Sequence, residues 1–251
     1  MKELDKELDI VIPVYNEGEN IVETLIALKQ SVKTSFRVLI CYDFNEDNTL
    51  PAVRDARGAG CDVQLVKNRG KGVHHAIMTG LGETEADAVL MYPADESYNT
   101  VIIDAMYTKL REGNDVVGAS RFMKGGAMKG GPFLKSLVLR AAAFTLKRFG
   151  GLGASDASYA LKMFSRRILD TVEIESTDGF TFAIELLVKC HRLGWKAAEV
   201  PARWLMREKG QSRFNFRKWL PHYFKWFLYA FATTYLRRGS ETVKLKSGAE
   251  I

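Results

Sequence analysis

The sequence DIVIPVYNE, residues 9–17, decides the fold class. Its first six residues are mostly β-branched and apolar, and a polar loop follows directly after Pro13. A short run of this kind is typical of a parallel strand that is buried on both faces. Proline fixes the backbone at the point where the strand ends. The stretch therefore predicts a buried strand whose carboxyl end presents Tyr15 and Glu17.

Similar apolar runs recur along the chain and alternate with stretches of helical periodicity. This alternation predicts an open α/β sheet, which binds ligands at the carboxyl ends of its strands. A glycine-rich stretch, residues 122–132, is predicted to form a mobile loop. The predicted strands are 9–14, 36–41, 62–66, 87–92, 115–119, 157–164 and 195–201, and the predicted helices are 18–31, 49–59, 71–83, 99–111, 133–149 and 180–193.

The charge distribution divides the chain near residue 120. Residues 1–120 hold 12 basic and 20 acidic side chains, whereas residues 121–251 hold 24 basic and 10 acidic ones. Basic proteins often bind nucleic acid, but no helix-turn-helix, zinc-finger or RRM signature accompanies this charge, so nucleic acid is not an expected partner. Three scattered cysteines favour free thiols in a reducing compartment. The charged first residues predict no secretory signal.

Residues 215–236 combine nine aromatic side chains with basic residues, and Arg237 and Arg238 follow them. His222 and Lys225 interrupt the stretch, so its uncharged part falls well short of the roughly 20 residues that a membrane-spanning helix needs. This pattern predicts an amphipathic helix at a membrane interface. The alternative is a helix packed on the sheet, with its aromatic side chains in the core.

Polar residues follow the predicted strands at three further points. Asp43 ends the second strand and is expected to point into the ligand crevice, whereas Asp47 is expected to stabilise the turn and cap the next helix. Residues 67–72, KNRGKG, form either a phosphate-facing loop or a solvated turn ahead of a helix. The fourth strand ends at Asp95 and Glu96, two adjacent carboxylates that can hold a hard divalent cation between two phosphates.

Together these motifs resemble those of the family 2 glycosyltransferases, in the branch of enzymes similar to dolichyl-phosphate mannose synthase. The resemblance covers about residues 9–215 and implies a GT-A fold, a Rossmann-like nucleotide-binding sheet with flanking helices. It implies a GT-A domain over 1–214, with a donor-nucleotide half (1–120) and an acceptor half (121–214), and a helix and tail over 215–251. The ordered motifs are PVYNE, a D-x-x-x-D-x-T loop from Asp43 to Thr49, NRGKG, PAD, GASR at 118–121, and R-x-x-G-x-S-R from Arg207 to Arg213.

The resemblance also implies roles for individual residues. Asp95 is the expected catalytic residue, acting through a Mg²⁺ or Mn²⁺ ion that Asp95 and Glu96 would hold. Pro93 stands where the family has the first Asp of its Asp-x-Asp motif, which places the metal site in question. The implied donor-binding residues are Pro13, Tyr15, Glu17, Cys41, Asp43, Ala94, Asp95 and Arg121, and the implied acceptor- or phosphate-binding residues are Arg121, Arg207, Ser212 and Arg213.

The activity implied is that of an inverting hexosyltransferase. It would move a sugar from a nucleotide-sugar donor, of the GDP-mannose or UDP-glucose type, to a lipid phosphate such as polyprenyl phosphate. The expected location is cytoplasmic and peripheral, on the anionic inner face of a membrane, with a membrane partner protein as a further candidate for anchoring. Two alternatives are a family 2 transferase with a soluble acceptor and a non-catalytic nucleotide-sugar-binding protein.

Overall fold

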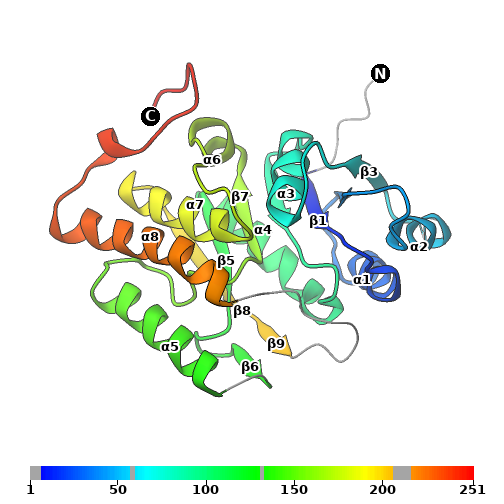
Figure 1. Cartoon of the computed structure of the whole chain (residues 1–251), viewed down its shortest axis with the longest axis horizontal. Helices are drawn as coiled ribbons and strands as arrows, with labels where there is room; N and C mark the ends of the chain where they lie inside the picture. Colours follow the sequence, from blue (N-terminus) through cyan, green and yellow to red (C-terminus); the bar gives the residue numbers. More distant parts are fainter. Residues whose placement is uncertain (1–6, 57–59, 131–132, 206–215) are drawn as a thin grey trace. The chain divides into compact units, whose positions relative to one another are not determined.

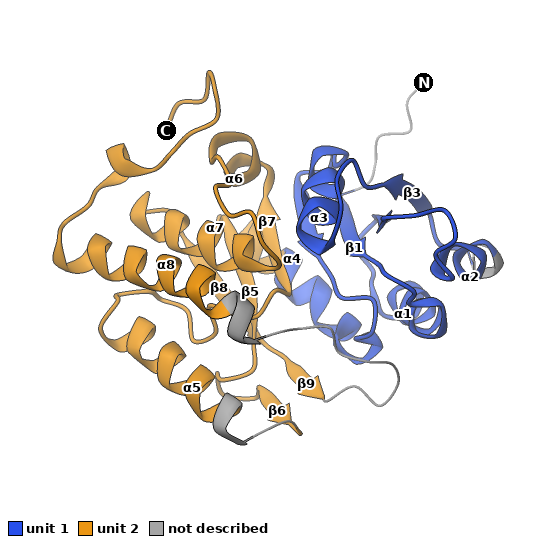
Figure 2. Ribbon diagram, in the orientation of Figure 1, with its two compact units in different colours: residues 1–107 blue, residues 108–251 orange. Residues whose placement is uncertain are grey.

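The computed structural model describes residues 7–56, 60–130, 133–205 and 216–251. Most of its helices and strands are labelled in Figure 1. The chain divides into two compact units, Met1–Tyr107 and Thr108–Ile251 (Figure 2). The boundary falls inside helix α4 (Ile103–Arg111), so the strand over 116–120 belongs to the second unit.

The first unit is built on parallel strands in the order β3-β2-β1-β4. Every residue of β1 except Pro13 is buried, as expected of a strand inside a covered parallel sheet. In the register, Leu8 of β1 lies opposite Phe36 of β2 and Ala88 of β4. The strands are β1 (Leu8–Pro13), β2 (Phe36–Tyr42), β3 (Val63–Lys67) and β4 (Ala88–Met91).

The helices of this unit pack on the sheet through apolar stripes. Helix α1 buries Ile21, Leu25 and Leu28 at helical spacing. Helix α3 approaches the sheet closely at Gly80, where a Cβ atom would lie 2.5 Å from Cys41 Sγ. The helices are α1 (Gly18–Ser31), α2 (Thr49–Ala56), α3 (Val73–Gly82), the 3-10 helix η2 (Ser97–Ile102) and α4.

The carboxylate of Asp9 is fully buried at the amino end of β1. It accepts bonds from Arg37 Nε (2.9 Å) and Nη2 (3.0 Å), and from the backbone amides of Glu85 (2.7 Å) and Ala86 (3.0 Å). Burial alone would raise the pKa of Asp9, but the bonds from Arg37 and the two amides outweigh it and hold that pKa below its ordinary value. The ionised form of Asp9 therefore stabilises the first unit.

We expect the stability contributed by Asp9 to be complete above its unfolded pKa of about 3.9 and to be lost as the pH falls through the lower folded value. An Asp9→Asn variant should be less stable at pH 7 by about 1.5–3 kcal/mol, the range for hydrogen bonds to a charged group. Hydrogen exchange of the β1 amides, measured as a function of pH, reports the stability of the first unit. The exposed Asp87→Asn change is the control, and equal behaviour of the two variants would contradict the assignment.

The second unit contributes the strands β7, β5 and β8 of the seven-stranded sheet and holds a separate two-stranded ribbon. Strand β5 (Val116–Ser120) pairs antiparallel with β7 (Lys162–Ser165) and parallel with β8 (Ala197–Pro201). In the ribbon, β6 (Ala127–Lys129) pairs parallel with β9 (Arg203–Leu205). The helices are α5 (Phe133–Arg148), α6 (Arg166–Thr171), α7 (Thr181–Arg192), α8 (Phe216–Tyr235) and the 3-10 helix η3 (Ser240–Thr242).

Two predicted elements of this half are corrected. Strand β6 lies inside the stretch predicted to be an irregular loop, because its backbone finds a partner strand about 75 residues further along the chain. The strand predicted over 157–164 begins only at Lys162. Residues 157–161 are not in a strand, and the carbonyl groups of Tyr159 and of Asp156, just before this stretch, accept hydrogen bonds from the Lys162 ammonium.

Helix α8 is apolar on two faces. One face is packed, with Trp226 only 1% exposed and Ala230 fully buried. The other face carries an exposed stripe of large side chains at spacings that return to the same side of a helix. The exposed stripe consists of Leu220, Phe224, Leu228 and Tyr235, which are 47%, 54%, 51% and 61% exposed. The helix is therefore packed through one face and exposed through the other, and its place at a membrane interface stays a prediction.

Among the residues that the structure describes, no helix has both the length and the apolar character needed to cross a membrane.

Candidate functional site

The loop after β1 is held in place by the loop after β2. The backbone amide of Asn16 donates to both carboxylate oxygens of Asp47 (3.1 Å each), and the amide of Glu17 donates to Thr49 Oγ1 (2.9 Å). Asp47 also accepts from the amide of Thr49, the first residue of α2 (2.8 Å). Asp47 thus has the expected capping role and, in addition, fastens the PVYNE loop across the carboxyl edge of the sheet.

Two aromatic rings stand at this edge. The ring of Tyr15 is 44% exposed and meets Phe44 edge-on, with 5.2 Å between ring centroids. Tyr15 follows β1 and Phe44 follows β2, so the topology brings together residues 29 positions apart. Phe44 was not among the predicted site residues. Its position one residue after Asp43 is the signal that would have identified it, because every residue just beyond a parallel strand lies at the ligand edge.

The carboxylate of Asp43 joins the end of β2 to the KNRGKG loop. One oxygen accepts from Asn68 Nδ2 (2.6 Å) and the other from the amide of Gly72 (2.8 Å). Gly72 has φ of +87°, a conformation that strongly favours glycine. Asn68 in turn accepts from the amide of Gly70 (2.9 Å) and from Thr79 Oγ1 (3.2 Å). Asp43 therefore shapes the loop, and only the remaining lone pairs of its carboxylate are left to face a ligand.

Asp95 and Glu96, the two predicted metal ligands, have different surroundings. Asp95 is half-buried just beyond β4, whereas Glu96 is 5% exposed and accepts from Asn99 Nδ2 (2.8 Å). Glu96 is turned into the protein, where Asn99 holds it. Its role as a second metal ligand stays a prediction.

The side chains near Asp95 supply only part of the oxygen ligands that a hard divalent cation needs. No group of three or more His, Cys, Asp or Glu side chains that could hold a metal occurs in the described part of the chain. One carboxylate is nevertheless a common protein contribution to a Mg²⁺ site, where phosphate oxygens and water complete the shell. Asp95 fits that arrangement, and the neighbouring Ala94 fixes the segment by accepting from Thr24 Oγ1 (2.7 Å) through its carbonyl.

Cys41, a predicted donor-binding residue, has no exposed side-chain surface. Its thiol faces Gly80 of α3, and burial raises the pKa of Cys41 to about 12. The contribution of Cys41 to the ligand edge is its carbonyl group, which accepts from the amide of Val14 (2.9 Å) and so holds the start of the PVYNE loop. The Cys41 thiol is therefore a core group and is not available to a nucleoside.

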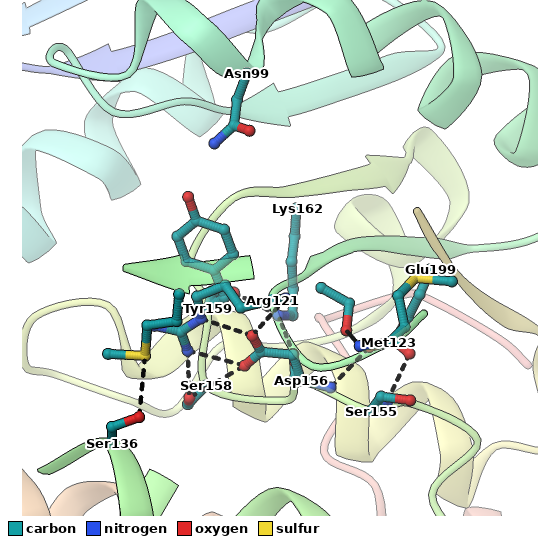
Figure 3. A network of polar contacts seen from close by, with 12 residues as sticks. Asn99, Arg121, Met123, Ser136, Ser155, Asp156, Ser158, Tyr159, Lys162 and Glu199 are labelled. Atoms are coloured by element: carbon teal, nitrogen blue, oxygen red, sulfur yellow. Dashed lines mark hydrogen bonds and ion pairs between the residues drawn. The ribbon is translucent and has the colours of Figure 1, made fainter. Parts of the chain in front are cut away.

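In the second unit, Arg121 is the centre of a buried charge network (Figure 3). Its guanidinium is 8% exposed and binds Asp156 through two bonds, from Nε (2.7 Å) and Nη2 (2.9 Å). Nη2 also donates to Ser158 Oγ (3.1 Å), and the guanidinium carbon lies 4.6 Å from the centre of the Tyr159 ring. Asp156 thus occupies the bidentate position of this guanidinium, and contact of Arg121 with phosphates stays a prediction.

Two further charged residues, Lys162 and Glu199, belong to this network. Lys162 is fully buried, and Glu199 accepts from the backbone amides of Ser155 (2.6 Å) and Asp156 (2.7 Å). Burial lowers the pKa of Lys162 to about 8, although the negative charges of Asp156 and Glu199 oppose that shift. Burial alone would raise the pKa of Asp156, but the charge and bonds of Arg121 hold it below its ordinary value. The network therefore depends on Asp156 being ionised.

The remaining predicted acceptor residues, Arg207, Ser212 and Arg213, lie outside the described residues.

The parallel strands, with polar loops fastened together at their carboxyl ends, define a nucleotide-binding α/β protein of the GT-A class. A family model described as glycosyl transferase family 2 matches residues 9–173, well over half of the chain. The chain belongs to this family, whose members are inverting glycosyltransferases, and the resemblance found in the sequence is confirmed.

The similar proteins include one curated relative and a group of solved structures. Dolichol-phosphate mannosyltransferase of Pyrococcus furiosus is 23% identical over 211 residues, which are 82% of this chain and 59% of that protein. The chain thus spans somewhat over half the length of that relative. Glucosyl-3-phosphoglycerate synthase of Mycobacterium tuberculosis has a similar fold.

Two structures of this synthase give the extent of the likeness. Its complex with UDP has a TM-score of 0.65 at 16% identity, covering 90% of this chain and 80% of that one. Its complex with Mn²⁺, UDP and glucosyl-3-phosphoglycerate has a TM-score of 0.62 at 18% identity, covering 93% and 80%. These similarities confirm the predicted GT-A fold.

Proposed function

We propose that this family 2 glycosyltransferase moves a sugar from a nucleotide-sugar donor to a lipid phosphate at a membrane surface. The donor side rests on the first unit. Tyr15 and Phe44 offer aromatic surface to a base, and the loop shaped by Asp43 presents the backbone ahead of α3 to phosphates. Glu17 and Pro13 lie at the same edge, where Glu17 accepts from Asn20 Nδ2 (2.7 Å).

We further propose that Asp95 is the residue through which a Mg²⁺ or Mn²⁺ ion is held against the donor diphosphate. Such an ion supplies positive charge that offsets the charge of a departing nucleoside diphosphate. The Mn²⁺ and UDP bound by glucosyl-3-phosphoglycerate synthase support this assignment. A phosphate acceptor is already ionised near neutral pH, so the proposal assigns no general base.

The acceptor half of the proposal rests on one observation, the exposed stripe of α8. Phe224 stacks on Phe227, and Phe231 stacks on Tyr235, so aromatic rings follow one another along the helix. Basic residues flank this surface, and each Lys or Arg near an anionic leaflet contributes about 1 kcal/mol of attraction. Helix α5 adds further exposed apolar side chains, Leu137 at 51% and Phe144 at 63%. This combination suits an enzyme that takes its acceptor from a membrane.

A transfer assay tests the proposal directly. The purified chain is incubated with GDP-mannose or UDP-glucose, Mg²⁺ or Mn²⁺, and polyprenyl phosphate in vesicles. We expect formation of a polyprenyl-phosphate sugar with inverted configuration at the anomeric carbon. Nucleotide binding with neither transfer nor hydrolysis would instead support the non-catalytic alternative.

A soluble acceptor is the second candidate. It is favoured by the structural similarity to glucosyl-3-phosphoglycerate synthase, whose structures include a complex with phosphoglyceric acid. The same assay, with 3-phosphoglycerate in place of polyprenyl phosphate, separates the two candidates.

Membrane binding by the exposed stripe gives a quantitative prediction. We expect Phe224→Ser to weaken binding to phosphatidylglycerol–phosphatidylcholine vesicles by about 1.5–3 kcal/mol, the free energy of burying one large apolar side chain. Co-sedimentation measures this change. The control is Val101→Ser, since Val101 is 69% exposed but lies in the first unit. Failure of the unmodified chain to bind vesicles would favour the soluble acceptor.

A further inference from the structure

The second unit contains a pocket whose described lining includes no residue of the family motifs. It has a volume of about 320 Å³ and is open to solvent. Helix α7 contributes Arg192 to its lining, helix α8 contributes residues between 225 and 232, and the tail beyond α8 contributes Arg238 and Thr242. The pocket therefore joins three segments that are separate in sequence.

The lining of this pocket is positively charged. It includes Arg192, Lys225 and Arg238, and no aspartate or glutamate is among the described residues that line it. The acidic residue of the adjoining tail, Glu241, turns its carboxylate to the amide of Gly239 (3.2 Å). Like charges gathered around one cavity repel one another, and an anion placed among them would relieve that repulsion. The charge of the pocket thus favours an anionic ligand.

Arg192 is held rigidly within this group of cations. Its Nε donates to Thr233 Oγ1 (2.8 Å), its Nη1 to Thr242 Oγ1 (3.1 Å) and its Nη2 to the carbonyl of Tyr229 (2.6 Å). These bonds use three of the five N–H donors of a guanidinium. The side chain is 8% exposed and its guanidinium carbon lies 3.2 Å from the centre of the Tyr229 ring. An anion would therefore meet a donor group that is already oriented.

The pocket also has an apolar side. Leu228 and Ala232 line it, one turn apart on α8. Leu228 is at the same time a member of the exposed apolar stripe of that helix. A ligand seated among the cations would thus have apolar surface beside it, continuous with the stripe.

We propose that this pocket binds a phosphate group carried by a molecule with an apolar portion. The site is additional to the donor and acceptor roles proposed above. Guanidinium and ammonium groups around a small open cavity match the charge and size of a phosphate monoester or diester. The phosphate can belong to a lipid headgroup or to a soluble phosphorylated compound, and the two sources differ in the acyl chains that would contact Leu228.

Binding of defined probes to the full chain tests the proposal. The probes are dihexanoyl phosphatidylglycerol below its micelle concentration, inorganic phosphate, and dihexanoyl phosphatidylcholine, whose headgroup has no net charge. The pocket variant is Lys225→Gln/Arg238→Gln. The control variant, Arg237→Gln/Lys246→Gln, removes the same charge from exposed residues outside the pocket lining. Calorimetric titration gives the affinities.

We expect the pocket variant to lose affinity for dihexanoyl phosphatidylglycerol by at least about tenfold, as for the loss of charge-assisted bonds to phosphate. The control variant should bind as the unmodified chain does. Tighter binding of phosphatidylglycerol than of phosphate identifies a lipid headgroup as the source, and equal binding of the two would contradict the apolar portion of the proposed ligand.

Two results would overturn the proposal: binding of neither anion, or equal loss of affinity in the pocket and control variants. Tryptophan fluorescence shows whether the double variant is folded. If it is not, the single Arg238→Gln variant, at an exposed position of the tail, gives the same comparison against Arg237→Gln.

Discussion

Replacement of Asp156 by asparagine is expected to destabilise the second unit by about 3–5 kcal/mol, the cost of leaving buried charge without its partner. Asparagine has nearly the same shape, so no cavity is created, and the loss reflects the missing charge and the exchange of one acceptor oxygen for an NH2 donor. Arg121 would lose its charged bidentate partner, and Lys162 would lose the negative charge of Asp156 in its fully buried surroundings. Urea unfolding followed by fluorescence measures this loss, because all four tryptophans lie in the second unit.

Asp170→Asn is the matched control for Asp156→Asn. Asp170 makes a long contact with Arg166 (3.8 Å) and its side chain is 63% exposed. Exposed pairs of this kind contribute about 0–1 kcal/mol, so the control should unfold close to the unmodified chain. A combined Arg121→Gln/Asp156→Asn variant should recover part of the lost stability, since it removes the unpaired guanidinium. A loss below about 1 kcal/mol in Asp156→Asn would contradict a buried, mutually dependent pair.

Replacement of Asp95 by asparagine is expected to lower kcat/KM for sugar transfer by about 10²–10³-fold, the size of effect seen when one group that stabilises transition-state charge is removed. The amide keeps the shape of the side chain but loses the negative charge that would hold a divalent cation. The same change should abolish the increase in UDP or GDP affinity that Mg²⁺ or Mn²⁺ produces. Calorimetric titration with and without the metal measures this second effect without any turnover.

Asp87→Asn makes the same chemical change near the opposite end of β4. Asp87 is exposed and lies just before the strand, whereas Asp95 follows it. We expect the Asp87 variant to keep both the transfer rate and the metal-dependent nucleotide affinity. Retention of full transfer by Asp95→Asn, or nucleotide binding by the unmodified chain that ignores the metal, would refute the assigned role of Asp95.

Asp95 and Glu96, the two carboxylates after β4, differ in burial, and the sequence alone does not predict this difference. Their adjacency indicated a metal site, and the strand before them was correctly predicted. The direction of Glu96 depended on Asn99, whose side chain binds it inside the protein. A short polar motif indicates which side chains are present at the end of a strand, but the packing around the motif decides where each side chain points.

The PVYNE loop shows the same difference between what the sequence predicts and what the packing decides. The strand before it and its position at the carboxyl edge were predicted from the apolar run. The bonds that fasten it come from Asp47 and Thr49, about 30 residues later, after an intervening helix and strand. The sequence indicated a capping role for Asp47, but not its contact with Asn16, because no local pattern encodes a contact across two loops.

The order of strands and helices, the acidic and basic halves and the family were determined by the sequence itself. These features depend on local periodicity, composition and ordered motifs, each of which is present in a short window of residues. The Arg121–Asp156 pair, the burial of the Cys41 thiol, the ribbon of β6 and β9 and the pocket around Arg192 were decided only by the tertiary structure. Each of these features brings together groups that are far apart in the chain and removes them from water. Because burying a polar group without a partner costs free energy, the folded chain pairs such groups with one another.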